Sequence, residues 1–487
     1  MKDEEIVGRA SEIKILKETL KSSESEFLAI YGRRRVGKTY LINKFFSGKG
    51  TYFEVTGQKD GLLQDQLEIF INAYSKYFYE GLQLRTPVSW REAFQLLDNK
   101  IQSSPKSKKF VIFLDELPWL ASRKSNLMQV IDHFWNSIWS KMPNVILIVC
   151  GSAASWMIDR LINAKGGLYN RLTKVIHLQP YSLKGTQEFL HHKGIDLKPM
   201  QILDIYMAFG GIPHYLKQIR KGKSAMQNIN DVCFQEDGVL YTEFNRLFDS
   251  LFDHSDTHKS IIREIGSKRE GISRDDLIEK TGIKSGGRLN KRLEELESSS
   301  FIQSYVPLGK KRKDKFYRIS DEYTYFYLKW IEHLVERGAS GGRAYWKTQS
   351  KTQSAITWKG YAFEMVCYKH IDQIRAALDL EEIFCEIGPW RYLPRKGALE
   401  SGAQIDLMFD RDDGAITICE IKYSDTVFSI DKKIAKNLTQ KIMTLDRHYS
   451  VDKQMFIAFI TTKGIKHSIW SDDLVQNEVT LNALFVF

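Results

Sequence analysis

The fold of this 487-residue chain is decided by one short stretch, Gly32-Arg33-Arg34-Arg35-Val36-Gly37-Lys38-Thr39. It satisfies the pattern G-x-x-x-x-G-K-[ST], in which glycines let backbone N–H groups turn toward phosphate oxygens. An apolar, strand-like run at residues 27–31 precedes it and a helical pattern at residues 38–46 follows it. A chance glycine–lysine turn would not require these neighbours. The stretch therefore predicts a phosphate-binding loop between a strand and a helix.

Each part of this loop has an expected task. Lys38 is expected to reach the β- and γ-phosphates of ATP, and Thr39 to offer its hydroxyl to Mg²⁺. The start of the following helix adds a dipole that favours phosphate. The residues predicted to contact the nucleotide here are Gly32, Arg35, Val36, Gly37, Lys38, Thr39 and Tyr40.

A second motif places two carboxylates after the apolar run 110–114. We expect Asp115 to hold the water shell of the metal ion and Glu116 to polarise the attacking water. The alternative is a pair of acids that begins a helix before Pro118. The presence of Lys38 in the same chain favours the catalytic interpretation, and Glu116 is the residue that predicts hydrolysis of ATP rather than binding alone.

Two further residues carry weaker hypotheses. Ser152 follows the apolar run 145–150 and could contact the γ-phosphate, although serine in such a turn is often only a turn residue. Arg171 could act as an arginine finger. An ordinary surface arginine explains Arg171 equally well.

The remaining chain changes its pattern several times. Buried runs alternating with helical stretches predict a parallel sheet in residues 1–180, and helical periodicity alone predicts a lid in residues 181–253. Three short helices (259–265, 274–280 and 285–297) and two strands (301–307 and 315–319) predict a winged helix-turn-helix in residues 254–335. The polar, glycine-rich stretch 337–354 is predicted to be a linker. A helix at 358–374 and several strands follow in residues 336–487.

Positive charge is concentrated in the predicted winged helix. Of the net charge of +11, residues 256–320 contribute +6, from 16 Lys and Arg against 10 Asp and Glu. Such a concentration favours contact with DNA phosphates. A protein-binding winged helix with a merely solvated basic loop is the alternative. The residues expected to contact DNA are Arg288, Lys291, Arg292, Lys310, Lys311, Arg312 and Lys313.

Several motifs occur in the order found in a known family. They are Val7-Gly8-Arg9 with Glu12, the phosphate loop, Leu114-Asp115-Glu116, Gly151-Ser152-Ala153 and Gly210-Gly211-Ile212-Pro213. Together they resemble prokaryotic AAA+/STAND-type P-loop ATPases. The resemblance implies that Gly8 and Arg9 lie near the adenine and that Gly211 and Pro213 in the lid replace the usual second sensor. Many members carry a winged helix and then a domain similar to restriction endonucleases.

The last part of the chain offers the residues that this resemblance implies. A PD-(D/E)xK nuclease site needs an Asp and a Glu for Mg²⁺, a Lys two residues after the Glu, and an acid on an earlier helix. Asp406 and Glu420 are the predicted metal ligands, Lys422 the predicted catalytic lysine and Glu364 the helical acid. Alternation along a strand places Glu420 and Lys422 on one face. A solvated Glu-x-Lys pair is the alternative.

The predicted fold is thus α/β: a P-loop NTPase core with a helical lid, a winged helix-turn-helix and a C-terminal restriction-endonuclease-like α/β domain. The sequence shows no signal peptide pattern and no apolar run long enough to cross a bilayer, so we expect a cytoplasmic protein without a membrane partner. Three functions stay open. The first is an ATP-dependent, DNA-acting enzyme whose nuclease domain is gated by nucleotide state. The second is a nucleotide-gated regulator that binds DNA or protein without cutting, and the third is a homo-oligomeric switch.

Overall fold

The computed structural model describes residues 6–163, 168, 170–283, 286–311, 313–342, 344–394, 402–449 and 452–486. Contacts divide the chain into two compact units. Unit 1 runs through Pro180 and includes the segments Ser250–Asp253 and Glu294–Ser300. Unit 2 comprises Tyr181–Asp249, His254–Leu293 and Phe301–Phe487. The four predicted sequence domains divide the chain more finely and stay a prediction.

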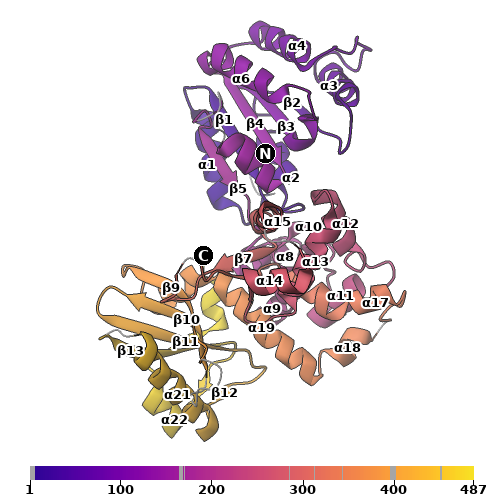
Figure 1. The fold of residues 1–487 in the computed structure, drawn as a ribbon. Helices are drawn as coiled ribbons and strands as arrows, with labels where there is room; N and C mark the ends of the chain where they lie inside the picture. Colours follow the sequence, from indigo (N-terminus) through magenta and orange to yellow (C-terminus); the bar gives the residue numbers. More distant parts are fainter. Residues whose placement is uncertain are drawn as a thin grey trace. The chain divides into compact units, whose positions relative to one another are not determined.

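Unit 1 is built on a parallel five-stranded sheet in the order β2-β3-β4-β1-β5 (Figure 1). Its strands are β1 (Glu26–Tyr31), β2 (Thr51–Thr56), β3 (Phe110–Asp115), β4 (Val145–Gly151) and β5 (Lys174–His177). Every residue of β3 and β4 is buried, which is why these strands read as unbroken apolar runs. The strands predicted at 27–31, 110–114 and 145–150 are confirmed, and the parallel pairing is as expected.

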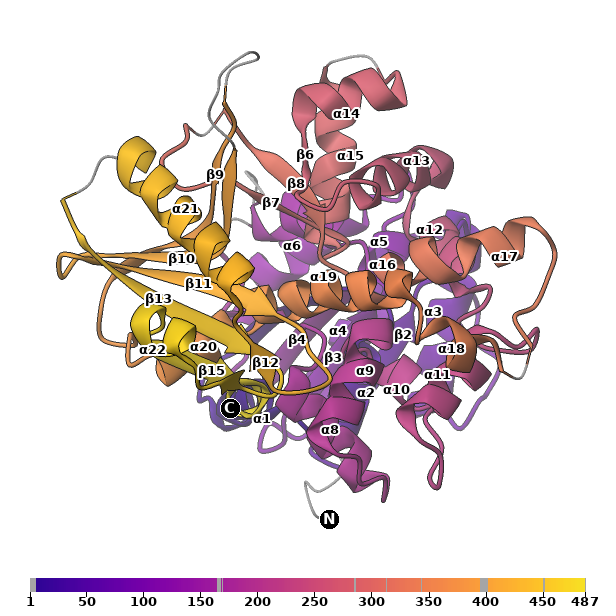
Figure 2. The same ribbon diagram turned by 90° about the horizontal axis from the view of Figure 1, so that it is seen from below.

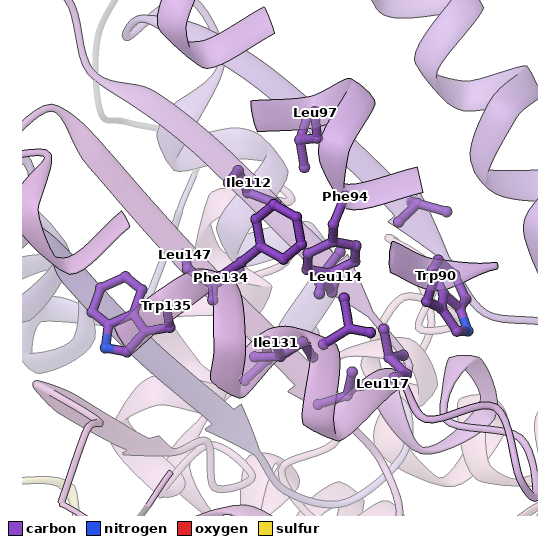
Figure 3. Packing of buried hydrophobic residues seen from close by; sticks show 14 of the residues in the cluster. Trp90, Phe94, Leu97, Ile112, Leu114, Leu117, Ile131, Phe134, Trp135 and Leu147 are labelled. Carbon is purple, nitrogen blue, oxygen red and sulfur yellow. The ribbon is translucent and has the colours of Figure 1, made fainter. Parts of the chain in front are cut away.

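Helices pack on this sheet through large apolar side chains. Unit 1 contains α1 (Ala10–Lys21), α2 (Lys38–Phe46), α3 (Leu63–Phe78), α4 (Trp90–Ser103), α5 (Leu117–Leu120), α6 (Leu127–Ser137) and α7 (Ala154–Met157). In the core cluster of Figure 3, the Phe94 ring lies 5.6 Å from that of Phe134 and 5.4 Å from that of Trp139, centroid to centroid. Truncating such a buried ring to alanine destabilises a fold by about 3–5 kcal/mol. This packing gives the phosphate loop a rigid base.

Unit 2 begins with helices, as the periodicity predicts. They are α8 (Leu183–His192), α9 (Pro199–Phe209), α10 (Pro213–Leu216), α11 (Ala225–Cys233), α12 (Glu243–Leu251), α13 (Ser255–Gly266), α14 (Arg274–Thr281) and α15 (Gly287–Ser298). The last residues of α12 and α15 belong to unit 1. The predicted hairpin is present as β7 (Ile302–Tyr305) and β8 (Phe316–Ile319), which pair antiparallel. A two-residue strand that the sequence did not predict, β6 (Ile272–Ser273), completes a sheet in the order β6-β8-β7.

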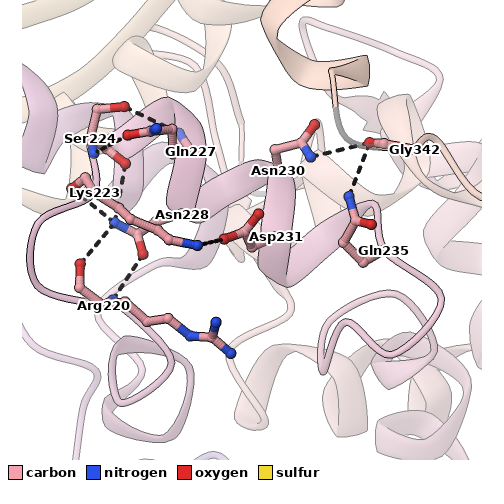
Figure 4. A network of polar contacts seen from close by, with 9 residues as sticks. All are labelled: Arg220, Lys223, Ser224, Gln227, Asn228, Asn230, Asp231, Gln235 and Gly342. Carbon is pink, nitrogen blue, oxygen red and sulfur yellow. Dashed lines mark hydrogen bonds and ion pairs between the residues drawn. The ribbon is translucent and has the colours of Figure 1, made fainter.

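The stretch predicted as a linker, 337–354, is packed into unit 2. Asn230 and Gln235 both donate side-chain hydrogen bonds to the carbonyl of Gly342, at 3.1 and 3.0 Å (Figure 4). The side chain of Trp346, in α18 (Tyr345–Gln349), is 3% exposed, and the backbone amide of Trp346 donates to Asn230 Oδ1 at 3.0 Å. The linker prediction is therefore wrong, because the aromatic pair Tyr345-Trp346 outweighs the glycines around it.

The C-terminal part of unit 2 contains a mixed five-stranded sheet in the order β15-β13-β11-β10-β9. Its strands are β9 (Cys385–Tyr392), β10 (Ala403–Arg411), β11 (Ala415–Lys422), β13 (Gln454–Thr461) and β15 (Asn477–Thr480). Strand β10 pairs antiparallel with β9 and β11, whereas β11, β13 and β15 run parallel. Strands β12 (Phe428–Ser429) and β14 (Ile465–Lys466) form a separate pair.

Helices border this sheet, and Figure 2 shows α21 crossing it and α19 beside it. These two helices are α19 (Gln353–Lys369) and α21 (Lys432–Tyr449), and the same part of unit 2 also contains α16 (Glu322–Trp330), α17 (Glu332–Glu336), α20 (Ile371–Ala377) and α22 (Ile469–Leu474). The helix predicted at 358–374 is interrupted at His370. There the buried imidazole accepts a hydrogen bond from Leu183 N at 3.0 Å and contacts Val366 O at 2.7 Å. Burial lowers the pKa of His370, which favours the neutral ring that can accept the hydrogen bond from Leu183.

Within the described ranges, no helix combines the length and the apolar character that crossing a membrane requires.

Candidate active sites

The phosphate loop joins β1 to α2 through unusual backbone conformations. Gly32, Arg35 and Gly37 have φ values of 145°, 72° and 94°. A Cβ on Gly32 would lie 2.3 Å from the carbonyl oxygen of Leu178, so no larger residue fits at that point. Glycine at the two ends therefore lets the chain curl and present its amides at the start of α2, where an anion is stabilised.

The lysine and threonine of the motif point to the positions expected of them. The ammonium of Lys38 is buried and donates to the carbonyls of Gly32 and Arg33 at 2.9 and 3.0 Å. Thr39 Oγ1 donates to Asp115 Oδ2 at 2.7 Å, which joins the loop to the end of β3. Burial raises the pKa of Asp115, and the hydrogen bond from Thr39 opposes that rise. The loop and the second motif thus meet at one edge of the sheet.

Glu116 has a strained backbone next to this pair. Its φ of 47° places a non-glycine residue in the left-handed region. The carboxylate accepts hydrogen bonds from the amide of Ser152, at 3.0 Å, and from the hydroxyl of the same serine. Strain of this kind concentrates at functional positions. Ser152, predicted as a γ-phosphate contact, is thus in direct contact with the predicted catalytic carboxylate.

Arg9 forms hydrogen bonds with the phosphate loop and with residues outside it. Its guanidinium donates to the carbonyls of Gln179 and Val36 at 2.7 and 3.1 Å and to Glu12 at 3.3 Å. Gly8, just before it, has a φ of 65°. These bonds give Arg9 a role in positioning the loop, while its predicted contact with adenine stays a prediction.

Three further residues have predicted roles at the nucleotide site: Tyr40, Arg171 and Pro213. The ring of Tyr40, in the first turn of α2, is 48% exposed, and Arg171 is exposed in unit 1. Pro213 begins α10 in unit 2. Their predicted roles remain predictions.

A second group of charged side chains lies in unit 2, and we call it the carboxylate site: Glu364, Asp406, Glu420, Lys422 and Lys441. Asp406 and Glu420 lie on the antiparallel strands β10 and β11, beside the paired residues Leu407 and Cys419. The pairing of β10 with β9 shifts register between Ile405 and Met408, an irregularity that spans Asp406 and Leu407. Bulges often redirect a side chain beside an active site.

The three carboxylates are held by different partners. Tyr368 OH donates to Glu364 Oε1 at 3.1 Å and to the backbone carbonyl of Asp406 at 2.5 Å. Asp406 Oδ2 accepts from the amide of Ile421 at 3.2 Å. Within the described ranges, no three His, Cys, Asp or Glu side chains form a metal-binding group.

Burial and mutual repulsion shift the pKa values of two of these acids upward. Burial, followed by the charge of Asp406, raises the pKa of Glu364 to about 7. Burial, followed by the charge of Glu420, raises the pKa of Asp406. Burial alone would also raise the pKa of Glu420, but Lys422 and Lys441 together bring it below its ordinary value.

Both lysines contact Glu420 directly. Lys422 Nζ lies 2.6 Å from Oε1, on the shared strand face that alternation predicts. Lys441 Nζ lies 3.0 and 2.8 Å from the two carboxylate oxygens. Lys441 was not predicted, because it comes from α21, where it is one of several lysines on an amphipathic helix and no local pattern singles it out.

The basic residues predicted to contact DNA lie where the sequence placed them. Arg288, Lys291 and Arg292 are on α15, and Lys310, Lys311 and Lys313 are exposed in the loop between β7 and β8. Arg312 lies outside the described residues, as does Lys284 before α15.

The geometry of unit 1 defines a class of protein. A parallel sheet, a glycine loop before a helix, and a Thr–Asp pair at the sheet edge are the parts of a P-loop nucleotide-binding domain. Residues 6–219 match the family described as an ATPase domain predominantly from Archaea. That part of the chain is accordingly a Walker-type ATPase domain.

Longer similarities extend beyond this domain. Over 445 residues the chain is 26% identical to the uncharacterized protein MJECL04 of Methanocaldococcus jannaschii, covering 89% of this chain and 91% of that protein. Among solved structures, it is similar to the Walker-type ATPase PABY2304 of Pyrococcus abyssi, with 21% identity, a TM-score of 0.48 and coverage of 67% of this chain and 97% of that one. It is also similar to the ORC2 protein of Aeropyrum pernix, with 13% identity, a TM-score of 0.40 and coverage of 69% and 97%.

Proposed function

We propose that this protein is an ATP-hydrolysing, DNA-acting enzyme in which nucleotide state gates a metal-dependent nuclease. The observation that carries the proposal is the carboxylate site. Glu364, Asp406 and Glu420 are buried, and burial together with a neighbouring carboxylate raises the pKa values of Glu364 and Asp406. A fold keeps such an arrangement at a stability cost, and perturbed acids of this kind concentrate at functional sites.

In this proposal two residues of the carboxylate site hold a divalent cation, which would displace the lysines from Glu420. Asp406 and Glu420 would hold Mg²⁺, which relieves their repulsion and supplies Lewis-acid chemistry at a phosphodiester. Lys422 would orient the attacking water, and Lys441 positions Glu420 with two hydrogen bonds. Glu364 would act as the helical acid. In this proposal residues 336–487 form the restriction-endonuclease-like domain.

On the ATPase side, the pair Thr39 and Asp115 offers two oxygens of the kind that Mg²⁺ and its waters prefer. Lys38 would leave the loop carbonyls for the phosphates, and Glu116 would polarise the attacking water. Gly8 and Arg9 remain the proposed residues near the base, and Pro213 in the lid remains part of the proposed replacement for the second sensor.

The DNA part of the proposal rests on charge. The winged helix would dock through α15 and the loop between β7 and β8, whose lysines are exposed.

The same protein would work in the cytoplasm, either alone or as a homo-oligomer.

Gating has a physical route within unit 2. Gly210 in the lid has a φ of 64°, and a Cβ there would lie 2.8 Å from a carboxylate oxygen of buried Glu322. Glu322 in turn pairs with Lys369 at 2.7 Å. Lys369 ends α19, the helix that carries Glu364. A lid movement driven by nucleotide would therefore reach the carboxylate site through close contacts.

A second candidate has its own supporting observation. Glu420 is already neutralised by two ammonium groups, which a carboxylate retained only for structure would also need. A nucleotide-gated regulator that binds DNA or a protein without cutting is consistent with that arrangement.

The deciding experiment measures DNA cleavage by the purified protein in Mg²⁺ or Mn²⁺, with and without ATP. The variants are Asp406→Ala, Lys38→Ala and, as a matched control in the exposed turn, Asp412→Ala. We expect Asp406→Ala to abolish cleavage, Lys38→Ala to remove its dependence on ATP, and Asp412→Ala to change neither. Intact ATP hydrolysis without cleavage of any form of DNA would favour the regulator.

A further inference from the structure

A cavity of about 530 Å³ lies in unit 2 between the end of α13 and helices α16 and α19. Cationic side chains line it together with aromatic rings: Arg263, Arg269, Lys329, Tyr325, Trp358 and Tyr361. The volume is in the range of small-molecule binding sites, which is roughly 300–1,000 Å³. The cavity is therefore large enough for a nucleotide, and its lining can meet both a phosphate and a base.

A second, narrower cavity of about 40 Å³ continues from the first. Both are lined by Gly266, Arg269, Tyr325 and Tyr361. The narrow part also reaches Glu364, the helical acid of the carboxylate site. The two cavities thus form one groove, whose wide part has room for a nucleotide and whose narrow end lies beside the proposed cutting site.

Arginines stack on tyrosines along this groove. The guanidinium of Arg269 lies 4.4 Å from the ring centroid of Tyr361. That of Arg318 lies 3.4 Å from the centroid of Tyr368 and 4.8 Å from that of Tyr305. Because Tyr368 donates to Glu364, this series of stacked pairs ends at the carboxylate site.

We propose that the wide part of this groove binds unpaired nucleotides of a DNA strand next to the carboxylate site. Proteins that bind single strands combine a cationic path for the backbone with rings on which bases stack. Both features are present here. The wide part has room for a nucleotide but not for a base-paired duplex, so the groove selects a single strand. The inference rests on the proposed nuclease function for the identity of the groove's end, but not for the binding itself.

Binding can be measured separately from cleavage. We would titrate the full-length protein with fluorescent oligo-dT at fixed ionic strength and in EDTA, and follow anisotropy. Arg269 is exposed, so its replacement tests binding without disturbing the fold. We expect Arg269→Ala and Tyr361→Leu each to weaken single-strand binding about tenfold, as alanine substitutions at stacking sites do. Arg220→Ala, an exposed arginine outside the groove, is the matched control and should change affinity less than about twofold.

Three results would overturn the inference. The first is unchanged affinity in both groove variants. The second is equal affinity for duplex and single strand with the same dependence on Arg269. The third is tight binding of AMP to the groove in the Lys38→Ala background, which would indicate a free nucleotide as the ligand. Binding that depends on Arg269, with no cleavage in Mg²⁺ or Mn²⁺, would support the groove and contradict only the nuclease. Cleavage that depends on Asp406 but not on Arg269, together with unchanged binding, would contradict only the groove.

Discussion

The nucleotide site and the carboxylate site both bury acids near the end of a strand, yet they compensate the charge differently. At the nucleotide site Asp115 accepts a hydrogen bond from the uncharged hydroxyl of Thr39. At the carboxylate site Glu420 accepts from two ammonium groups, those of Lys422 and Lys441. The first arrangement leaves a negative charge for a cation to neutralise, whereas the second has neutralised part of it in advance.

The two sites also differ in how they are built. The phosphate cradle consists largely of backbone from one continuous loop, and its shape depends on glycine conformations. The carboxylate site consists of side chains from α19, β10, β11 and α21. Substitutions should therefore reduce the activity of the phosphate loop only at the few side chains that take part in the chemistry. The activity of the carboxylate site should respond to substitutions in each of the elements that supply its side chains.

The largest effect is expected at Glu116. Glu116→Gln keeps the shape of the side chain but removes its capacity as a base, so ATP hydrolysis should fall about 100- to 1,000-fold while ATP binding persists. Single-turnover hydrolysis and nucleotide binding would be measured together. The exposed Glu80→Gln is the control. Retention of more than about a tenth of the rate would assign the base elsewhere.

A smaller effect is expected at Lys441, and it would sharpen the contrast in charge compensation. Lys441→Met should lower cleavage about tenfold, the size of a lost charged hydrogen bond. Because Lys441 helps to keep the pKa of Glu420 low, its loss raises that pKa, and activity should fall first on the acid side of the pH profile. Lys436→Met, exposed on the same helix, should leave the profile unmoved. An unshifted profile in Lys441→Met would remove Lys441 from the site.

At Glu364 we expect a substitution to change the stability of the folded protein, by an amount that depends on pH. Its pKa rises from the ordinary 4.5 to about 7, so the folded state binds the extra proton and wild-type stability falls as pH rises through this window. Glu364→Gln removes that penalty. In EDTA at pH 8 it should raise the melting temperature by roughly 3 °C, a shift that about 1 kcal/mol produces. The gain should vanish toward pH 4.5, and a gain independent of pH would indicate a packing effect instead.

The smallest effect is expected where the lid meets α19. Glu322→Gln weakens the pairing with Lys369 and should reduce the ratio of cleavage with ATP to cleavage without it about twofold to threefold, while ATP hydrolysis is unchanged. The ratio would be compared with that of Glu336→Gln, an exposed control. An unchanged ratio in Glu322→Gln would mean that any coupling takes another route.

The same contrast explains how much could be read from the sequence. The phosphate loop, β1, β3, β4 and α2 were predicted nearly to the residue, because a contiguous motif and fully buried strands leave strong local patterns. Asp406, Glu420 and Lys422 could be proposed from spacing on two paired strands. Lys441 could not, since only tertiary packing selects one lysine among many on α21.

Other differences also have physical causes. The sequence did not predict the edge strands β2 and β5, because both are partly exposed and leave no continuous apolar run; β5 is also short. The break at His370 depends on a hydrogen bond from Leu183, 187 residues away in sequence. The supposed linker was misread because its composition resembles a loop, whereas Trp346 buries it.

The burial of Trp346 against Asn230 has a consequence for how the chain holds together over time. The stretch 337–354 joins α11 to the rings of Phe234 and Trp358, so the lid helices share a cooperative unit with the elements that follow. Amide protons in α11 and α18 should then exchange with deuterium in one common opening event. A chain cut short before residue 337 would leave the apolar side of α11 uncovered and prone to aggregation.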